Sequence, residues 1–452
     1  MTSSATRDIA QYVVGMQLAD IPQLAIARAK TAILDTIGVT LAGSRLATGR
    51  MMMGYVEQTG ATAVSTVFAS NHGSSPELAA LANGLLAHVL DYDDRGHVST
   101  HTLPAALALG ERDDVSGAEF LVSYITGREV RQHIDEEFRP GRKSLDGSKE
   151  KGSGPGWRGW HETGVVGAIG ATAAAARVTR LGVDQTVMAL GIAASLASGL
   201  MANFGTSTKS LHAGNAARNG VLAASLAAKG FTADPDTLTT RRGYVEALSY
   251  PETRDMTKVA ESLRSYFHLV EKGIRIKPYP ACTGTHQFIE TMRYLCREHA
   301  LGPADVETIT ISRISGQTTK RDFPTTELEC KFSPAFVAIA TLVDGQLTLD
   351  NCTREFLFRP DVQDLLNRTT YEDSASGFIR VLTKQGETFE SASRPVRDLI
   401  VPDESLAKFF DCAEPIIGKE RATRIHEIVG EIEELRSVRE LTALLTLGGM
   451  NS

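Results

Sequence analysis

The sequence predicts a mainly α protein built from a large all-α helical domain and a smaller α+β domain. Apolar residues recur at helical spacing over most of the first 268 residues. Near residue 270, prolines and β-branched residues become frequent and strand patterns appear, and amphipathic helix returns after residue 402. We therefore expect residues 1–268 and 403–452 to form the helical domain and residues 269–402 to form the α+β domain.

The first third of the chain predicts a series of helices, because apolar residues recur every three or four positions and prolines and glycines mark the ends. The expected helices are residues 5–43 in two pieces joined near Pro22, Pro76 to Leu90, a helix opened by Pro104, and Ala118 to Ile134. Between them, residues 61–70 are rich in Thr, Ser and Val, which indicates a short strand or an extended link.

The middle of the chain combines a polar loop with small-residue helices. Residues 139–160 are rich in Gly, Ser, Lys and Arg, which predicts a surface loop, and residues 164–230 are dominated by Ala, Gly, Leu and Val at helical spacing. Gly164, Gly167 and Gly170 recur every three positions. Since no strand precedes them and the spacing is not G-x-G-x-x-G, they predict close helix–helix contact and not a phosphate loop.

The α+β domain is predicted from its own sequence patterns. A helix is expected from Gln287 to His299, followed by a strand from Val306 to Ile314. Two further short strands flank Gln385-Gly386-Glu387, which is typical of a hairpin turn.

Composition narrows the class of protein. The 452 residues include 47 Lys and Arg against 54 Asp and Glu, a formal net charge of −7 without a basic block, which argues against nucleic acid as the main partner. The five cysteines are widely spaced and form no C-x-x-C pair, so neither a disulfide framework nor a zinc site is indicated. The most apolar run, Val187 to Met201, is shorter than a membrane span. We expect a cytoplasmic protein that does not bind membranes.

One polar stretch stands between two apolar runs. Within eleven positions it holds three carboxylates, one guanidinium and two imidazoles: Asp91, Asp93, Asp94, Arg95, His97 and His101. Burying charge is costly unless the charge is paired or used on a ligand. A solvated loop with helix caps is the alternative, but this density of charge favours a functional site.

Further candidates lie on later loops. His161 follows the Gly-rich loop, and Lys209 lies in a Gly/Ser/Thr loop. Lys277 precedes a Pro-Tyr-Pro segment, and Cys282 and His286 follow that segment. Four of them have a structural alternative: a capping histidine for His161, a solvated lysine for Lys209, an exposed strand-end lysine for Lys277 and a small buried thiol for Cys282.

A metal site is the less favoured hypothesis for the polar stretch. His97 and His101 are spaced like two ligands on one helix face, and the aspartates could add oxygens. However, H-E-x-x-H is absent and Gly96 indicates a loop, so we expect no metal.

Histidines, lysines and carboxylates on loops suggest instead acid–base chemistry on a carboxylated small molecule. Removing a proton α to a carboxylate creates a dianion that cationic groups must neutralise.

The chain resembles the MmgE/PrpD family over nearly its whole length. The matching segments are Asn83 to Asp94, His161 to Gly164, Ser198-Gly199, Thr208 to Gly214, Leu226 to Thr232, Lys277 to Cys282, and Lys331 to Ser333. The resemblance implies a helical domain with a smaller α+β lid, a homodimer, and no cofactor in most members. It also implies an activity among 2-methylcitrate dehydration, cis-aconitate decarboxylation and iminodisuccinate epimerisation.

The resemblance implies a site between the two domains. Asp91, His101, His161, Lys209 and Lys277 fall on matching positions. The departures are Cys282 where the decarboxylases carry a histidine, Phe336 in place of a pocket tyrosine, and Arg95 in place of a small hydroxylic residue. These departures weaken the decarboxylase assignment, and the arginine suits a substrate with a further anionic or polar group.

We therefore expect a cofactor-independent hydro-lyase of the 2-methylcitrate dehydratase type, acting on a polycarboxylic acid. The expected catalytic residues are His101, His161, Lys209 and Asp91, and the expected substrate-binding residues are Arg95, Lys277, Cys282 and His286. The two histidines would serve as base and acid in either order. The alternatives are an epimerase or isomerase of a dicarboxylic acid, a decarboxylase, and a catalytically inactive member that serves as a binding or scaffold subunit.

Overall fold

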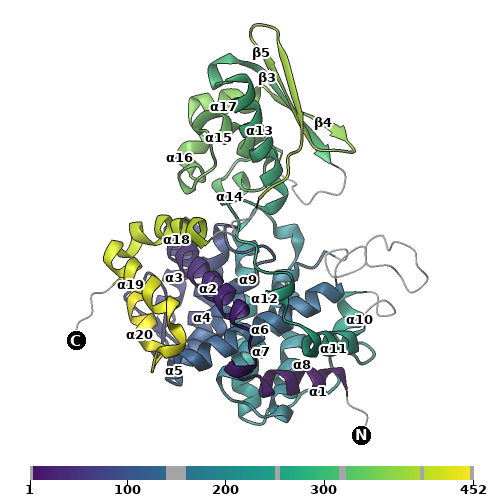
Figure 1. Ribbon diagram of the computed structural model, residues 1–452, viewed down its shortest axis with the longest axis vertical. Helices are drawn as coiled ribbons and strands as arrows, with labels where there is room; N and C mark the ends of the chain where they lie inside the picture. Colours follow the sequence, from purple (N-terminus) through teal and green to yellow (C-terminus); the bar gives the residue numbers. More distant parts are fainter. Residues whose placement is uncertain (1–3, 139–158, 250–254, 315–321, 398–401, 448–452) are drawn as a thin grey trace.

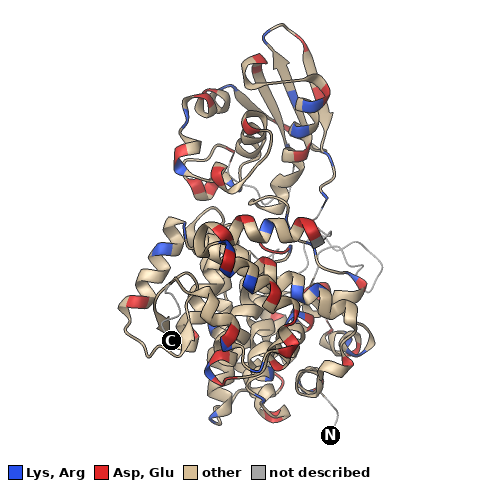
Figure 2. Ribbon diagram, turned by 60° about the vertical axis from the view of Figure 1, so that its left-hand side comes forward, with Lys and Arg blue, Asp and Glu red and all other residues tan. Residues whose placement is uncertain are grey.

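The computed structural model describes residues 4–138, 159–249, 255–314, 322–397 and 402–447, and it contains two parts (Figure 1). The lower part in this view is helical, and the upper part contains a sheet with helices against it. This confirms the predicted fold class. Acidic and basic residues are interspersed along the helices of both parts (Figure 2).

The helical part is assembled around α4, α5, α6, α7 and α9, which pack against one another. Its longer helices are α1 (Ala5–Gly15), α2 (Gln23–Gly43), α3 (Ala47–Gln58), α4 (Pro76–Val89), α5 (Ser99–Arg112), α6 (Gly117–Phe138), α7 (Glu162–Val178), α8 (Val183–Leu196) and α9 (Ser207–Ala228). The shorter α10 (Tyr244–Leu248), α11 (Met256–Ser265) and α12 (His268–Glu271) follow. Among the described residues, no helix combines the length and the apolar character that crossing a membrane requires.

Glycines let these helices approach closely, as the spacing in α7 predicts. A Cβ atom on Gly170 would lie 2.5 Å from Cβ of Arg131 on α6, and one on Gly167 would lie 2.9 Å from Nδ1 of His101 on α5. A Cβ atom on Gly164 would lie 2.1 Å from the carbonyl oxygen of Ser198. The three glycines therefore serve packing, which confirms the prediction of close helix–helix contact.

The α+β part has a four-stranded sheet in the order β4-β3-β5-β6. β3 (Val306–Ile314) pairs parallel with β4 (Thr369–Ser374) and antiparallel with β5 (Phe378–Thr383), which forms a hairpin with β6 (Thr388–Ala392). The helices of this part are α13 (His286–His299), α14 (Glu327–Cys330), α15 (Pro334–Asp344), α16 (Arg354–Leu357) and α17 (Pro360–Asn367). Its buried apolar core runs from Tyr279 to Val381. The predicted strand and hairpin are confirmed.

The C-terminal helices return to the helical part. α18 (Pro402–Ile417) packs on α2, followed by α19 (Lys419–Gly430) and α20 (Arg439–Thr442). The contact is close because α2 has a glycine there: a Cβ atom on Gly38 would lie 3.0 Å from the Phe409 ring. Lys408 of α18 forms a buried ion pair with Asp35 of α2 at 2.7 Å.

One local prediction is corrected, the short strand or extended link at residues 61–70 is confirmed, and one prediction is not covered. α5 begins at Ser99 and not at Pro104, which lies inside the helix; Val98 is the N-cap residue, and the Ser99 backbone N donates to the Asp94 carboxylate at 3.3 Å. Residues 61–70 contain only the two-residue strand β1 (Ser65–Thr66), paired with β2 (Gly73–Ser74). Most of the predicted loop at 139–160 lies outside the described residues.

Candidate active site

The polar stretch forms a tight loop between the end of α4 and the start of α5. Asp91, Gly96 and His97 have φ values of 54°, 84° and 58°. For the two residues with side chains this left-handed conformation costs about 1 kcal/mol or more each. A bridge between Asp94 and Ile276 ties the loop to the segment that enters the α+β part. Strained backbone that is held in place from outside is common at functional sites.

Asp91 lies buried between two lysines that come from distant segments. Its side chain accepts from Lys277 Nζ at 2.5 Å and forms an ion pair with Lys209 Nζ, and its backbone oxygen accepts from Lys277 at 2.9 Å. Asp91 and Lys277 are 2% and 0% exposed. One carboxylate thus faces two ammonium groups in a buried place, and Asp93 supplies a second negative charge near Lys277. Three of the predicted residues are brought together.

The pKa values follow this arrangement. Burial raises the pKa of Asp91, but Lys209 and Lys277 outweigh burial and hold that pKa well below its usual value. Burial lowers the pKa of Lys277, but Asp91 and Asp93 outweigh burial and raise it. Asp91 and Lys277 are therefore charged at neutral pH.

A third lysine, missed by sequence reasoning, lies beside this group. Lys331 is 3% exposed, and its Nζ donates to the backbone oxygen of Val89 at the end of α4. Burial lowers its pKa. Its place in the Lys331 to Ser333 family segment was the available signal, but position in a sequence does not show that a lysine is buried.

Phe332, and not Phe336, lies beside the lysines. Lys209 Nζ lies 4.9 Å from the centre of the Phe332 ring and 5.0 Å from that of Phe204. Phe336 is 0% exposed and packs against Phe356 in the core of the α+β part. The expectation that Phe336 stands at a pocket position is therefore wrong, because the first turn of α15 directs this side chain into the core.

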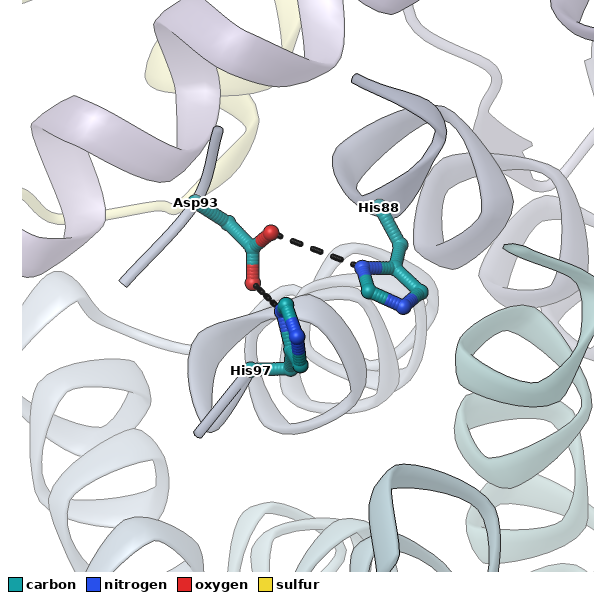
Figure 3. Close-up of side chains that lie close together, drawn as sticks. All are labelled: His88, Asp93 and His97. Atoms are coloured by element: carbon teal, nitrogen blue, oxygen red, sulfur yellow. Dashed lines mark hydrogen bonds and ion pairs between the residues drawn. The ribbon is translucent and has the colours of Figure 1, made fainter. Parts of the chain in front are cut away.

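Asp93 joins two imidazoles (Figure 3). Its oxygens lie 2.7 Å from His97 Nδ1 and 3.4 Å from His88 Nδ1. Both imidazoles therefore have Nδ1 as the protonated nitrogen, which leaves Nε2 as the basic one. Burial lowers the pKa of His88 to about 3 and also lowers that of His97, despite Asp93. His88 and the pairing role of Asp93 were not predicted.

His88, Asp93 and His97 are also close enough to hold a metal ion, with one ligand atom from each lying within 4.8 Å of the others. This set differs from the pair weighed in the sequence, because His101 is not part of it. The Asp93 oxygens already accept two imidazole N–H groups, and Lys209 further disfavours positive charge at His88. A hydrogen-bonded cluster explains the arrangement without an ion.

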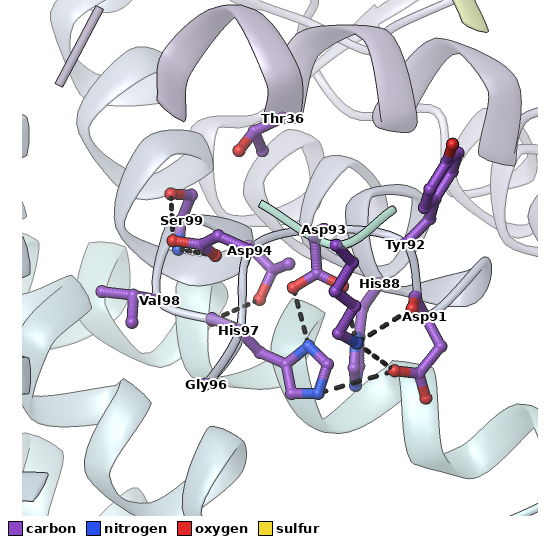
Figure 4. A network of polar contacts seen from close by, with 12 residues as sticks. Thr36, His88, Asp91, Tyr92, Asp93, Asp94, Gly96, His97, Val98 and Ser99 are labelled. Atoms are coloured by element: carbon purple, nitrogen blue, oxygen red, sulfur yellow. Dashed lines mark hydrogen bonds and ion pairs between the residues drawn. The ribbon is translucent and has the colours of Figure 1, made fainter. Parts of the chain in front are cut away.

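Asp94 has a different role from its neighbours. It forms a 2.5 Å ion pair with Arg128 of α6 and accepts from the Ser99 hydroxyl at 3.2 Å. Figure 4 shows Asp94 and Ser99 on the opposite side of the loop from Asp91. This carboxylate therefore anchors the loop.

His161 pairs with a second imidazole. His161 is the N-cap residue of α7, and its Nδ1 lies 3.0 Å from Nδ1 of His212, in the second turn of α9. The His161 ring centre lies 5.9 Å from that of His88 and 4.8 Å from that of Phe204. Burial, followed by the charge of Lys209, holds the pKa of His161 well below its usual value, so it is neutral and can act as a base.

His101 is buried on α5 behind this cluster. It is 0% exposed, and neither of its ring nitrogens has a hydrogen-bond partner among the described residues. Burial, followed by the charge of Arg131, holds its pKa well below the usual value. Within the described part of the chain, ring contacts link His88, His97, His161 and His212 but do not include His101. Its catalytic role stays a prediction.

The remaining predicted residues lie on or beside the segment that enters the α+β part. The Arg95 backbone N donates to Arg275 at 2.8 Å, and that of Cys282 donates to Lys331 at 3.0 Å. Burial, followed by Asp91, raises the pKa of the Cys282 thiol, so it is protonated at neutral pH. His286 is 0% exposed and bonds through Nε2 to Ala281 O at 2.9 Å. Their roles toward a substrate stay predictions.

Comparison with known proteins gives consistent matches over most of the chain. The MmgE/PrpD N-terminal domain model matches residues 7–256, and the MmgE/PrpD C-terminal domain model matches residues 279–434. The chain is 30% identical to cis-aconitate decarboxylase of Homo sapiens, covering 98% of this chain and 95% of that protein. It is 25% identical to cis-aconitate decarboxylase of Aspergillus terreus, covering 98% and 96%.

Proposed function

The chain belongs to the MmgE/PrpD family of enzymes and is of the lyase type, and we propose that it dehydrates a small polycarboxylic acid. In the proposed reaction a proton α to a carboxylate is removed and a hydroxyl group leaves from the adjacent carbon. No metal ion takes part in this proposal.

The observation that carries the proposal is the buried Asp91 with two lysines. Removing an α proton places a second negative charge on the substrate, and fixed cations in a buried site stabilise such charge strongly. Among the described residues, Asp91 is the one carboxylate in direct ion pairs with Lys209 and Lys277, so a substrate carboxylate can bind their other N–H donors without leaving a buried anion unpaired. Asp91 fixes both ammonium groups before substrate arrives.

The neutral imidazoles supply the proton transfers. His161 is a neutral base close to the lysines, since Lys209 is the largest charged influence on its pKa. In a dehydration the same site must also protonate the leaving hydroxyl, and His101 is the second candidate for this role. Arg95 is proposed to contact a further polar group of the substrate.

Decarboxylation is the second candidate, because the relatives compared above carry that name. It shares the need for cations around a carboxylated dianion. Cys282 speaks against it, since the decarboxylases carry a histidine at the matching position and the buried thiol is a poor acid. Epimerisation requires the same proton removal and is the third candidate.

Incubation with citrate, 2-methylcitrate, cis-aconitate and aspartate-like diacids in D2O, followed by proton NMR, tests the proposal. Loss of water without loss of carbon is expected from a hydroxy acid: a vinyl proton signal appears from citrate, and the methyl doublet of 2-methylcitrate becomes a singlet. Itaconate from cis-aconitate would move the assignment to decarboxylation, and deuterium in an unchanged skeleton would move it to epimerisation.

The controls use two histidines. His161→Asn should abolish the signals, whereas His426→Asn, a half-buried histidine on α19, should leave them unchanged. Silence of the wild-type protein across the whole panel would sink the proposal and favour a scaffold role.

A further inference from the structure

We propose that His212 is the proton-relay partner of His161, so that protons move between the substrate site and solvent through the bond between their two Nδ1 atoms. This inference rests on the proposed function, because it concerns the proton that the lyase removes. His212 touches no reacting atom in this proposal, and its role is to carry the proton that His161 receives.

The distance between the two rings forces their protonation to be coupled. The Nδ1 atoms lie 3.0 Å apart, which is hydrogen-bond distance. A neutral imidazole has one N–H donor and one acceptor nitrogen, so one Nδ1 donates and the other accepts. When His161 donates, its Nε2 is a base. When His161 accepts, its Nε2 carries a proton and is an acid.

The surrounding backbone holds the two rings together. The His161 backbone N donates to Gly199 O at 2.9 Å. Gly199 has φ 139°, and a Cβ atom there would lie 3.0 Å from Cγ of His212. A Cβ atom on Gly164, in the first turn of α7, would lie 3.4 Å from Cβ of His212 and 2.1 Å from Ser198 O. Glycine at both positions lets the loop and α7 close on His212.

The pair has an inner and an outer member. The His161 ring lies near those of His88 and His97, with centres 5.9 and 6.4 Å away. His212 lies against Gly199, which is flanked by the exposed residues Ser198 and Leu200, although the exposed fractions of the two imidazoles are similar, 6% for His161 and 7% for His212. One proton transfer across the pair therefore moves a proton from the buried cluster to the layer beneath the surface.

Both rings are neutral at neutral pH, as the relay requires. Burial, followed by His88 and Lys209, lowers the pKa of His212 to about 4, and burial and Lys209 also hold the pKa of His161 well below its usual value. A positive charge therefore does not accumulate on the pair, and the proton passes through it.

The steps balance as follows. The substrate C–H bond breaks, its electron pair stays on carbon, and the proton binds His161 Nε2. The Nδ1 proton of His161 moves to Nδ1 of His212, and the Nε2 proton of His212 leaves to solvent. His161 then holds a proton on Nε2 and can donate it to the leaving hydroxyl, and the reverse sequence restores the pair.

Two variants of His212 test the relay on a substrate that the wild-type protein turns over. His212→Asn keeps a hydrogen-bonding group near Nδ1 but carries no proton, and His212→Ala leaves space for a small base. Both should lower kcat about tenfold or more with KM within about twofold. Imidazole in the buffer should raise kcat of His212→Ala severalfold and leave the wild-type rate unchanged. His426→Asn should match the wild-type protein with and without imidazole.

Other results would overturn the relay. Full activity of His212→Asn would do so, because an amide cannot carry the proton. Loss of activity in His212→Ala that imidazole does not restore, in a protein with the wild-type unfolding temperature, would assign His212 a packing role.

A readout without substrate separates failure of the relay from failure of the proposed function. In the 15N spectra of histidine-labelled protein, the shifts of His161 should report a changed tautomer in His212→Ala but not in His426→Asn. If the wild-type protein turns nothing over, the proposed function fails while this measurement still tests the coupling. Unchanged His161 shifts would overturn the coupling itself.

Discussion

Two carboxylates three positions apart, Asp94 and Asp91, show how burial of charge differs between an anchor and a reactive site. Asp94 meets one guanidinium, from Arg128, and the hydroxyl of Ser99. Asp91 is shared by two ammonium groups, and Asp93 is a further carboxylate near Lys277. Both arrangements are buried, so burial alone does not identify function. The sharing of partners does, because a carboxylate divided between two ammonium groups leaves N–H donors that a substrate anion can bind.

The largest expected effect comes from breaking the buried ion pair between Asp94 and Arg128. Arg128→Met should lower the free energy of unfolding by about 3–5 kcal/mol, because it leaves the buried Asp94 unpaired. Urea unfolding measures this loss. The double variant Asp94→Asn with Arg128→Met should recover part of it. If Arg128→Met kept its stability and lost only activity, the contrast between the two carboxylates would be wrong.

The next effect separates activity from stability at the reactive site. Lys209→Met should lower kcat/KM by about 10²–10³-fold, the usual cost of removing one group that stabilises transition-state charge. Its unfolding free energy should change by less than about 1 kcal/mol, because Asp91 keeps Lys277 as its partner.

Steady-state kinetics and urea unfolding measure the two quantities. Lys229→Met, at the exposed C-terminal end of the same helix, is the control and should change neither. A loss of stability in Lys209→Met as large as that expected for Arg128→Met would mean that Lys209 is an anchor.

Acid should lower the free energy of unfolding over the pH range in which His88 is neutral only in the folded protein. The folded pKa of His88 is lowered to about 3, whereas an unfolded histidine has a pKa of about 6.5. Its contribution to stability is therefore complete above pH about 6.5 and is lost as pH falls toward 3. Between pH 7 and pH 5 this one residue should cost about 2 kcal/mol.

The comparison needs a variant in which the other histidines are unchanged. Between pH 7 and pH 5, His88→Gln should lose about 2 kcal/mol less stability than the wild-type protein, since glutamine does not titrate. Urea unfolding at the two pH values measures this. Equal losses in both proteins would show that His88 is not held neutral by burial.

The smallest effect concerns Cys282. Its thiol is protonated at neutral pH because burial raises its pKa, so it is not a nucleophile. Cys282→Ser should therefore keep kcat within about threefold of the wild-type value. Treatment with iodoacetamide should inactivate the wild-type protein only slowly. A hundredfold loss of kcat in Cys282→Ser would require a direct role in the chemistry.

The sequence by itself determined the fold class, most helices and the strand Val306–Ile314, and it pointed to the region of the candidate site. These follow from local periodicity, from prolines and glycines, and from the density of charge beside apolar runs. The start of α5 was misplaced because Pro104 lies inside the helix, and a proline does not by itself show whether it stands at a helix start or further in. The glycines of α7 also predicted close packing correctly, since a missing side chain is visible in a sequence.

Only the tertiary structure decided how the charged residues divide their roles. Asp91 and Asp94 look alike in the sequence, and the helices that bring Lys209 and Arg128 to them settle the difference. The bond between His161 and His212 joins residues 51 positions apart. The physical reason is that a side chain's partner depends on how helices pack and which way each turn directs it, and neither is encoded in local spacing.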